Sequence, residues 1–124
     1  MAKPSRAKGI GGEREVRRLL EDYGIAYQWN GYAAQRAPGA TPDVETERYA
    51  IEVKRRREGT FQDAWWLQAR IAADALLLTP AVVYRFVRKK WRIRTLMRLD
   101  HANKRLIADA AFEDWLEAAQ KTIP

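Results

Sequence analysis

The chain has 124 residues, a hydrophobic fraction of 47% and a formal net charge of +7. This length suffices for one domain with its own core, and the charge either favours a polyanionic partner, meaning nucleic acid or an anionic membrane surface, or serves solubility alone. The absence of cysteine excludes disulfides and thiolate metal sites, and the single histidine, His101, excludes histidine-rich zinc sites.

The N-terminus and the hydropathy of the chain indicate a cytoplasmic protein. No apolar run approaches the length of a membrane span. The start, MAKPSRAKG, is basic and lacks the apolar region of a signal peptide. We read residues 1–10 as a mobile basic tail and residues 11–124 as a single domain, because we find no internal repeat or linker.

The first predicted element is a helix over residues 12–23. Its apolar side chains have the i, i+3, i+4, i+7 spacing of one helix face: Val16, Leu19, Leu20 and Tyr23. Gly24 is a typical helix stop. Residues 25–37 predict a strand followed by a loop, and the Pro and Gly residues at positions 38, 39 and 42 mark a turn.

The segment TPDVETERYAIEVK, residues 41–54, predicts two short strands that turn at Glu47 and Arg48. Side chains alternate between the two faces of a strand. The apolar side chains therefore share one face: Val44, Ile51 and Val53. The charged side chains share the other: Asp43, Glu45, Glu52 and Lys54. With this turn, Asp43 falls directly opposite Glu52.

The remaining elements complete an α/β pattern. A helix follows Gly59, with Thr60 as its predicted cap and one face formed by Phe61, Ala64, Trp65, Gln68, Ile71, Ala72 and Ala75. Two strands, residues 81–87 and 91–99, are joined by the basic turn RKK, and a last helix covers residues 112–120. The order, roughly α-β-β-β-α-β-β-α, predicts a mixed central sheet with helices packed against it.

Two carboxylates directly opposite each other in paired strands repel and weaken the sheet. Exposure to solvent, neutralisation by Lys54 and the three arginines after it, or a divalent cation would each offset this cost. Magnesium binds through a few carboxylates, carbonyls and waters, with phosphate supplying the rest. For that third alternative, Asp43, Glu52 and the carbonyl of Val53 form a partial shell. Lys54 shares their face and could hold a water or contact a phosphate.

Three blocks of this sequence resemble a known nuclease family. PDV followed by IEVK resembles the core signature of the PD-(D/E)xK nuclease superfamily. KGIGGEREVRRLLEDYG resembles the first helix of the archaeal-type Holliday-junction resolvases in that superfamily, where a lysine-glycine pair precedes a glutamate by four residues. Lys8, Gly9 and Glu13 fit that spacing. IEVKRRREG and the later WWLQA are similar to phage-encoded relatives with a glutamine on the next helix. The resemblance covers roughly residues 8–75.

The resemblance implies a restriction-endonuclease-like fold, a nuclease domain over residues 11–124, and hydrolysis of phosphodiester bonds in DNA, in a bacterial or phage-infected cell. Asp43 and Glu52 would bind Mg²⁺ or Mn²⁺, and Glu13 would complete the metal shell or bind a second water. Lys54 would position the attacking water and stabilise the transition state. The helical wheel does not choose between Glu13 and Glu15, and Glu13 is preferred because of the resemblance.

Gln68 is predicted near the centre of an apolar helix face, where an amide is costly unless it is hydrogen-bonded. It is either a core residue bonded to backbone or a residue that orients Lys54, a metal-bound water or a phosphate. The glutamine of the relatives favours the second alternative.

Basic residues lie on several predicted elements. The candidates for phosphate contact are Lys8, Arg36, Arg55, Arg56, Arg57, Arg92 and Arg94. For the strand arginines Arg92 and Arg94, the alternative is a solvated strand face. The resolvases carry a hydroxyl residue after the arginine at the place of Arg36, whereas here Ala37 follows it.

The partner implied by these observations is DNA, with a four-way junction as the expected substrate. Because such a junction is close to two-fold symmetric, paired cuts call for two active sites, and we expect a homodimer. Two alternatives remain open. One is a nuclease for flaps, other branched DNA or restriction-like sites, and the other is a non-catalytic DNA-binding protein whose acids only balance its charge.

Overall fold

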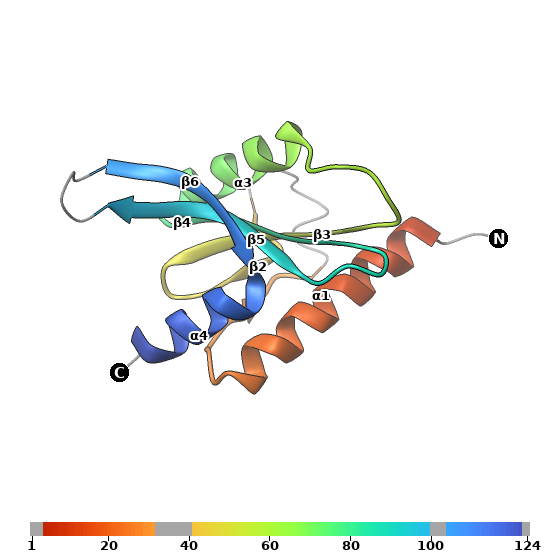
Figure 1. Cartoon of the computed structure of the whole chain (residues 1–124), viewed down its shortest axis with the longest axis horizontal. Coiled ribbons are helices and arrows are strands. Elements are labelled where there is room, and N and C mark those ends of the chain that lie inside the picture. The colour runs from red at the N-terminus through yellow and green to blue at the C-terminus, as the bar shows by residue number, and fades with distance from the viewer. Residues whose placement is uncertain (1–3, 32–40, 100–103, 123–124) are drawn as a thin grey trace.

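The computed structural model describes residues 4–31, 41–99 and 104–122, and at residues 4–11 and 99 it describes the backbone alone. Figure 1 shows a central sheet with helices on both sides. The described elements are α1 (Pro4–Asp22), β1 (Gln28–Trp29), β2 (Val44–Glu45), β3 (Tyr49–Arg56), α3 (Asp63–Leu76), β4 (Thr79–Phe86), β5 (Arg92–Leu99), β6 (Lys104–Ala111) and α4 (Phe112–Thr122). Among these helices, none is long and apolar enough to cross a membrane.

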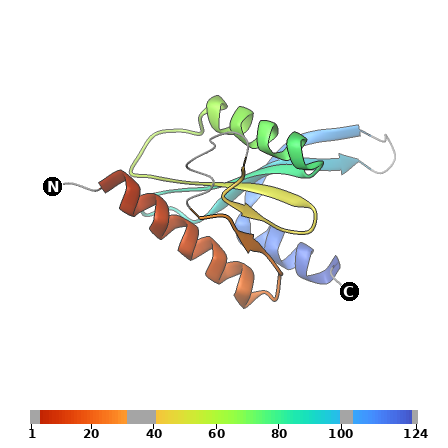
Figure 2. The ribbon, with the colours of Figure 1, turned by 180° about the vertical axis from the view of Figure 1, so that it is seen from behind.

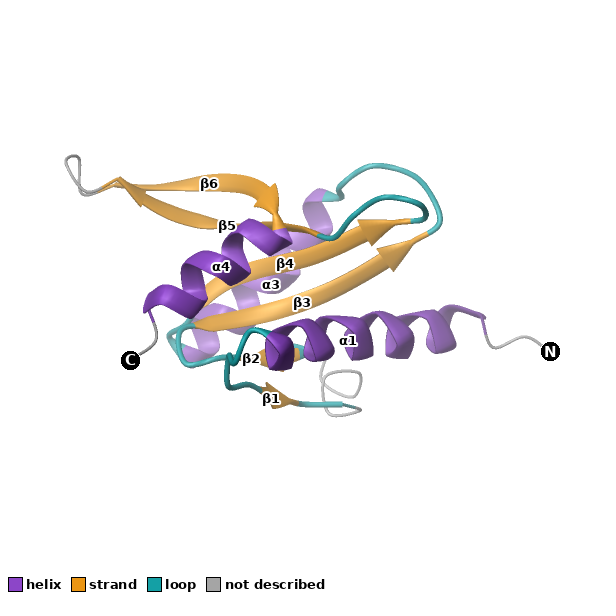
Figure 3. Ribbon diagram, turned by 60° about the horizontal axis from the view of Figure 1, so that its bottom comes forward, coloured by secondary structure: helices purple, strands orange, loops and turns teal. Residues whose placement is uncertain are grey.

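The described strands form one six-stranded mixed sheet in the order β1-β2-β3-β4-β5-β6. β3 and β4 run parallel and are connected by α3, while the other neighbouring pairs are antiparallel. In Figure 3, β3 and β4 end at the same side of the molecule, which is also where α1 begins. Side chains at the C-terminal ends of these two strands therefore lie on the same side of the molecule.

Helices α1 and α4 cover one face of the sheet and α3 covers the other (Figures 1 and 2). The larger core lies under α1 and α4. It is formed by Val16, Leu20, Ile25, Val44, Ile51, Val53, Ala81, Val83, Trp91, Ile93, Phe112 and Leu116. The smaller cluster lies under α3 and contains Trp65, Ala69, Val82 and Tyr84. Alternation along β3 places Ile51 and Val53 in the larger core, so Glu52 and Lys54 point to the face covered by α3.

Helix α1 begins earlier than the sequence predicted. It starts at Pro4 rather than near residue 12, so residues 4–10 of the expected tail belong to its first turns. Proline is tolerated in the first turn of a helix, because the N–H that it lacks would have no partner there. The division into a tail and a single domain stays a prediction.

The predicted buried face of α3 was wrong in its rotation. The buried residues are Trp65, Ala69, Ala72 and Ala73, whereas Ile71 is 50% exposed. The helix begins at Asp63, and Gln62, not Thr60, is its N-cap, without a side-chain capping bond. The alanines present little bulk toward the sheet, so the choice of buried face follows the fit to β4 rather than the size of the apolar side chains.

Strand β6 was not predicted from the sequence. It pairs with β5 from Lys104 to Ala111, and its first four residues are exposed. Leu106 and Ile107 are neighbours, which breaks the alternation expected of a half-buried strand, and alanine has a low β-propensity. The expected turn at His101 lies outside the described residues.

Candidate active site

The carboxylates of Asp43 and Glu52 form the centre of the site. β2 and β3 pair with Val44 opposite Ile51 and Glu45 opposite Ala50. Extending this register by one residue places Asp43 opposite Glu52, as the predicted turn requires. The backbone N–H of Val53 donates a hydrogen bond to Asp43 Oδ2 at 2.8 Å, which fixes the direction of that carboxylate.

Glu52 is 1% exposed, and its Oε1 atom is buried without a hydrogen-bond partner among the described residues. Burial, together with the charge of Asp43, raises the pKa of Glu52 to about 9, although Lys54 opposes this shift. Burial also raises the pKa of Asp43, against the Val53 N–H and Lys54. Each of the two carboxyl groups therefore acts on the pKa of the other. An unpartnered oxygen on a buried acid is costly, so the site favours a bound cation.

Glu13 approaches this pair because α1 lies close to β3. At Gly12, a Cβ would come within 3.2 Å of the Arg55 Cβ, closer than side chains ordinarily approach. Glu13 is 7% exposed, and its Oε1 accepts a 2.8 Å hydrogen bond from Trp29 Nε1. Burial, and then the charge of Asp43, raises the pKa of Glu13 to about 7. Burial therefore raises the pKa values of all three acids, Glu13, Asp43 and Glu52.

Glu15, the alternative to Glu13, is engaged elsewhere. Its carboxylate forms ion pairs with Arg85 at 2.7 Å and with Arg55 at 3.4 Å. It also accepts a 3.2 Å hydrogen bond from Trp91 Nε1. Glu13, rather than Glu15, is thus the helix-one acid beside the carboxylate pair.

Lys54 lies on the same strand face as Glu52 and is held by α3. Its Nζ donates a 2.8 Å hydrogen bond to Gln68 Oε1. Gln68 is half-buried, and its amide oxygen accepts from a side chain rather than from the backbone. This contact fixes the ammonium group near the acids, where its charge opposes the rise in their pKa values.

The donor set fits a hard dication that retains waters. In the described part of the chain, no three acidic, histidine or cysteine side chains meet closely enough to form a metal cluster on their own. Asp43 and Glu52 supply two carboxylates, and the unpartnered Oε1 of Glu52 supplies a free acceptor. Magnesium commonly takes one or two carboxylates and completes its shell with water and phosphate. These residues therefore suit Mg²⁺ or Mn²⁺ better than a cation that needs a complete protein cage.

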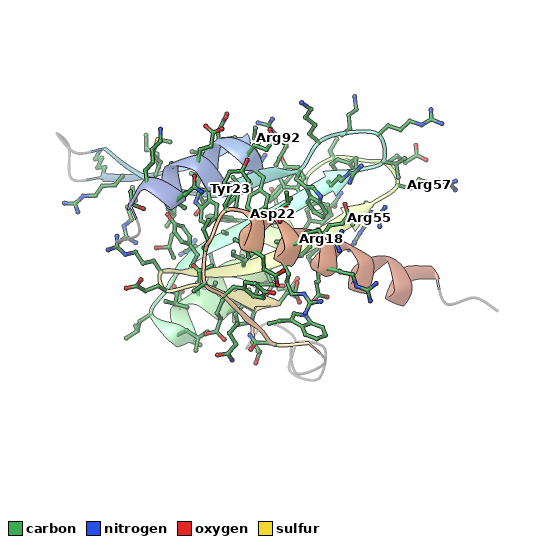
Figure 4. All side chains as sticks on the ribbon, turned by 90° about the horizontal axis from the view of Figure 1, so that it is seen from below. Arg18, Asp22, Tyr23, Arg55, Arg57 and Arg92 are labelled. Atoms are coloured by element: carbon green, nitrogen blue, oxygen red, sulfur yellow. The ribbon has the colours of Figure 1, made fainter. Side chains whose placement is uncertain are left out.

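The expected DNA-binding residues of β3 have different surroundings. Arg55 pairs with Glu15, whereas the Arg56 guanidinium lies 5.4 Å from the centre of the Trp65 ring. Arg57 is exposed, and Figure 4 shows it near the end of the molecule where α1 begins. The side chain of Lys8 and the whole of Arg36 lie outside the described part, so their predicted roles are not placed.

Arg92 and Arg94 are not simply a solvated strand face. Their Nε atoms bond to the two oxygens of Asp109, at 2.6 Å and 3.1 Å. Asp109 also accepts a 2.5 Å hydrogen bond from the Tyr84 hydroxyl. Asp109 was not among the predicted residues because β6, which carries it, was not predicted. Trp29 was not predicted either, since no periodicity links position 29 to Glu13.

No protein-family model matches the chain, and no curated protein matches its sequence significantly. Among solved structures, the chain is similar to Hjc from Archaeoglobus fulgidus, a Holliday junction resolvase from an archaeal hyperthermophile. The TM-score is 0.59 and the sequence identity is 22%, over 87% of this chain and 97% of that chain. The likeness confirms the predicted fold class, a restriction-endonuclease-like mixed sheet flanked by helices.

Proposed function

We propose that this protein is a metal-dependent DNA endonuclease of the PD-(D/E)xK superfamily that resolves four-way (Holliday) junctions. The observation that carries the proposal is the buried carboxylate pair, with an unpartnered oxygen on Glu52, beside a lysine held by Gln68. A protein that only binds DNA has no need to bury two acids in its sheet. The shared fold with a Holliday junction resolvase supports the choice of substrate.

The cofactor in this proposal is Mg²⁺ or Mn²⁺. Asp43, Glu52 and the carbonyl of Val53 would hold the cation, and Glu13 would complete its shell or bind a water of that shell. A bound cation of this kind supplies charge that lowers the pKa of a coordinated water and screens the phosphate. The Val53 N–H keeps Asp43 aimed at the site, and Trp29 does the same for Glu13.

Lys54 is the cation that the protein itself brings to the reaction. Its ammonium group would hold the attacking water and stabilise the charge that develops on the phosphate oxygens. Gln68 would act as a positioning residue, since it accepts one Nζ hydrogen and leaves the other two free for water or phosphate.

Replacing Gln68 by leucine is expected to lower the single-turnover cleavage rate about 10-fold, because the loss of a positioned contact costs about 1.4 kcal/mol of transition-state stabilisation. The same substitution in a Lys54→Met background should have almost no further effect, since the two residues act as a unit. Equal effects in both backgrounds would show that Gln68 acts independently of Lys54.

DNA binding in this proposal rests on charge. The protein has a net charge of +7, and Arg56 and Arg57, which follow Lys54 closely in the chain, are exposed. The remaining predicted DNA contacts are Lys8, Arg36, Arg55, Arg92 and Arg94. We further propose a C2 homodimer, because the two cuts in a symmetric junction require two copies of the site.

The experiment that tests the proposed function compares end-labelled DNA substrates at equal concentration: a four-way junction, a flap and a linear duplex. We expect paired nicks in the junction with magnesium, no cleavage with a chelator, and little cleavage of the linear duplex. Glu52→Gln should bind the junction and fail to cut it. Preferred cutting of flaps or duplex would reassign the substrate, and tight binding without cleavage in magnesium or manganese would leave a non-catalytic DNA-binding protein.

A further inference from the structure

A second basic site lies on the α3 side of the sheet, beyond the carboxylate pair. A groove of about 360 Å³ is lined by Thr60, Phe61, Tyr84, Arg85, Phe86, Lys89, Lys90, Arg92 and Arg94. We call this the basic groove. Its cations come from β4, β5 and the turn between them.

The arginines of the basic groove are held in place before any ligand binds. Asp109 fixes both Arg92 and Arg94 through their Nε atoms, and the Arg94 guanidinium lies 3.7 Å from the centre of the Phe61 ring. The Tyr84 and Phe61 rings pack edge to face at 5.1 Å and form a rigid wall. Because these bonds use the Nε atoms, the terminal guanidinium nitrogens of Arg92 and Arg94 can still donate to an anion.

The groove carries more positive charge than its own acid neutralises. Asp109 is shared by two arginines, and Lys89 and Lys90 form no ion pair with any acidic side chain that the structure describes. Arg92 remains 47% exposed despite its bond to Asp109. Uncompensated, preorganised cations around an open groove favour a phosphate-bearing ligand.

The groove and the carboxylate pair lie at different strands of the sheet, the pair at β2 and β3 and the groove at β4 and β5. Lys54 pairs with Tyr84, and Tyr84 pairs with Arg92, so these residues form a row across β3, β4 and β5. Two strand spacings of about 4.8 Å separate the ends of this row by about 10 Å of backbone. Phe61, which precedes α3, and Trp65, in the first turn of α3, stand over its middle and pack on Tyr84. The groove is therefore a phosphate site separate from Lys54, with the Phe61 and Trp65 rings between the two.

We propose that the basic groove binds a phosphodiester segment of DNA other than the segment that is cut. This inference rests on the proposed function and extends it to a second point of contact. The segment belongs either to the complementary strand of the same arm or to a neighbouring arm of the junction. The chemistry is the same in both cases, because a backbone phosphate accepts from lysine and arginine donors without sequence reading.

The test is equilibrium binding without metal, measured by fluorescence anisotropy over a range of salt concentrations. We expect Lys89→Ala/Lys90→Ala to weaken junction binding about 10-fold or more at low salt. The slope of log K against log salt should shrink by about 2, since each lost phosphate contact removes about 0.9. Lys104→Ala/Arg105→Ala, which removes the same charge from exposed positions of β6, is the matched control and should bind like the wild type.

A second variant localises the effect to this groove, because Lys89 and Lys90 also border a cavity of about 380 Å³ on the α1 and α4 side of the sheet. Arg92→Gln should weaken binding in the same direction, and it leaves Arg94 to pair with Asp109. A loss on the junction and on a linear duplex alike would place the complementary strand in the groove. A loss on the junction alone would place a neighbouring arm there.

If both groove variants bind the junction as tightly as the control variant does, the groove proposal is wrong, even if the wild-type protein cuts junctions. Conversely, the wild-type protein could cut no DNA while the groove variants still lower the DNA affinity and the salt slope. In that case the groove proposal stands and the nuclease proposal fails. The two proposals therefore fail by different measurements.

Discussion

Replacing Lys54 by methionine should lower the rate of junction cleavage by about 10²–10³-fold while leaving junction affinity within a few-fold of the wild type. Methionine keeps an unbranched side chain of similar length and removes the ammonium group. The charge that is lost is the one held by Gln68 and placed beside the Asp43 and Glu52 carboxylates. A donor aimed at developing charge acts mostly in the transition state, so the loss should fall on the rate rather than on binding.

The measurement is single-turnover cleavage with saturating protein, so that a small change in affinity does not alter the observed rate. Arg48→Met is a suitable control, because Arg48 is an exposed cation in the turn between β2 and β3. The control should cut at the wild-type rate. If Lys54→Met also cuts within a few-fold of the wild type, Lys54 is a structural or DNA-binding residue and the assigned chemistry is wrong.

The metal-free protein should become less stable as the pH rises from about 4.5 toward 9. The folded-state pKa is about 9 for Glu52 and about 7 for Glu13, and that of Asp43 is raised as well. In the unfolded chain these acids titrate near their ordinary values, about 4. Between the two values the folded state holds more protons than the unfolded state, so the free energy of unfolding falls as pH increases. For one carboxyl the limiting slope is about 1.4 kcal/mol per pH unit.

Urea unfolding in the presence of a chelator, repeated across this pH range, measures the effect. Glu52→Gln should flatten the dependence, because the amide is neutral at every pH and occupies nearly the same volume. Glu47→Gln, which removes an exposed carboxylate from the β2–β3 turn, serves as the control and should keep the wild-type slope. Equal slopes in the wild type and Glu52→Gln would mean that Glu52 is not a buried acid.

Magnesium should restore stability at the alkaline end of the same titration. A ligand that binds only the folded state stabilises it by mass action. At high pH the carboxyls are ionised and available as ligands, so the gain should grow with pH. Glu52→Gln should lose this gain. A magnesium effect of equal size in Glu52→Gln would place the cation elsewhere on the protein.

The centre of the site could be predicted from the sequence because it is local. Asp43 and Glu52 lie on two adjacent strands joined by a short turn, and the alternation of side chains fixes which residues share a face. The turn at Glu47 and Arg48 then fixed the register, and the structure has that register. The burial of Ile51 and Val53, with Glu52 and Lys54 on the opposite face, follows from the same period.

The partners of these acids depend on contacts between elements distant in sequence. The helical wheel left Glu13 and Glu15 equivalent, since both flank the apolar stripe. The close approach of α1 to β3 at Gly12 places Glu13 beside the pair, while Arg85 and Arg55 hold Glu15. No local pattern contains that information, because it arises when two packed surfaces meet.

Helix α3 and strand β6 show the same limit. The apolar residues of α3 are consistent with a buried helix face centred near Gln68. The face that is buried in the structure is instead the one whose small alanines fit against β4. Because β6 was not predicted, Arg92 and Arg94 were predicted as a basic strand face without an acidic partner. Their partner, Asp109, lies on β6, the neighbouring strand. The sequence by itself determined which side chains meet at the centre of the site, where covalent spacing and strand alternation set geometry over a few residues. The tertiary structure decided which distant charges compensate one another, because that depends on how the helices and the sheet pack.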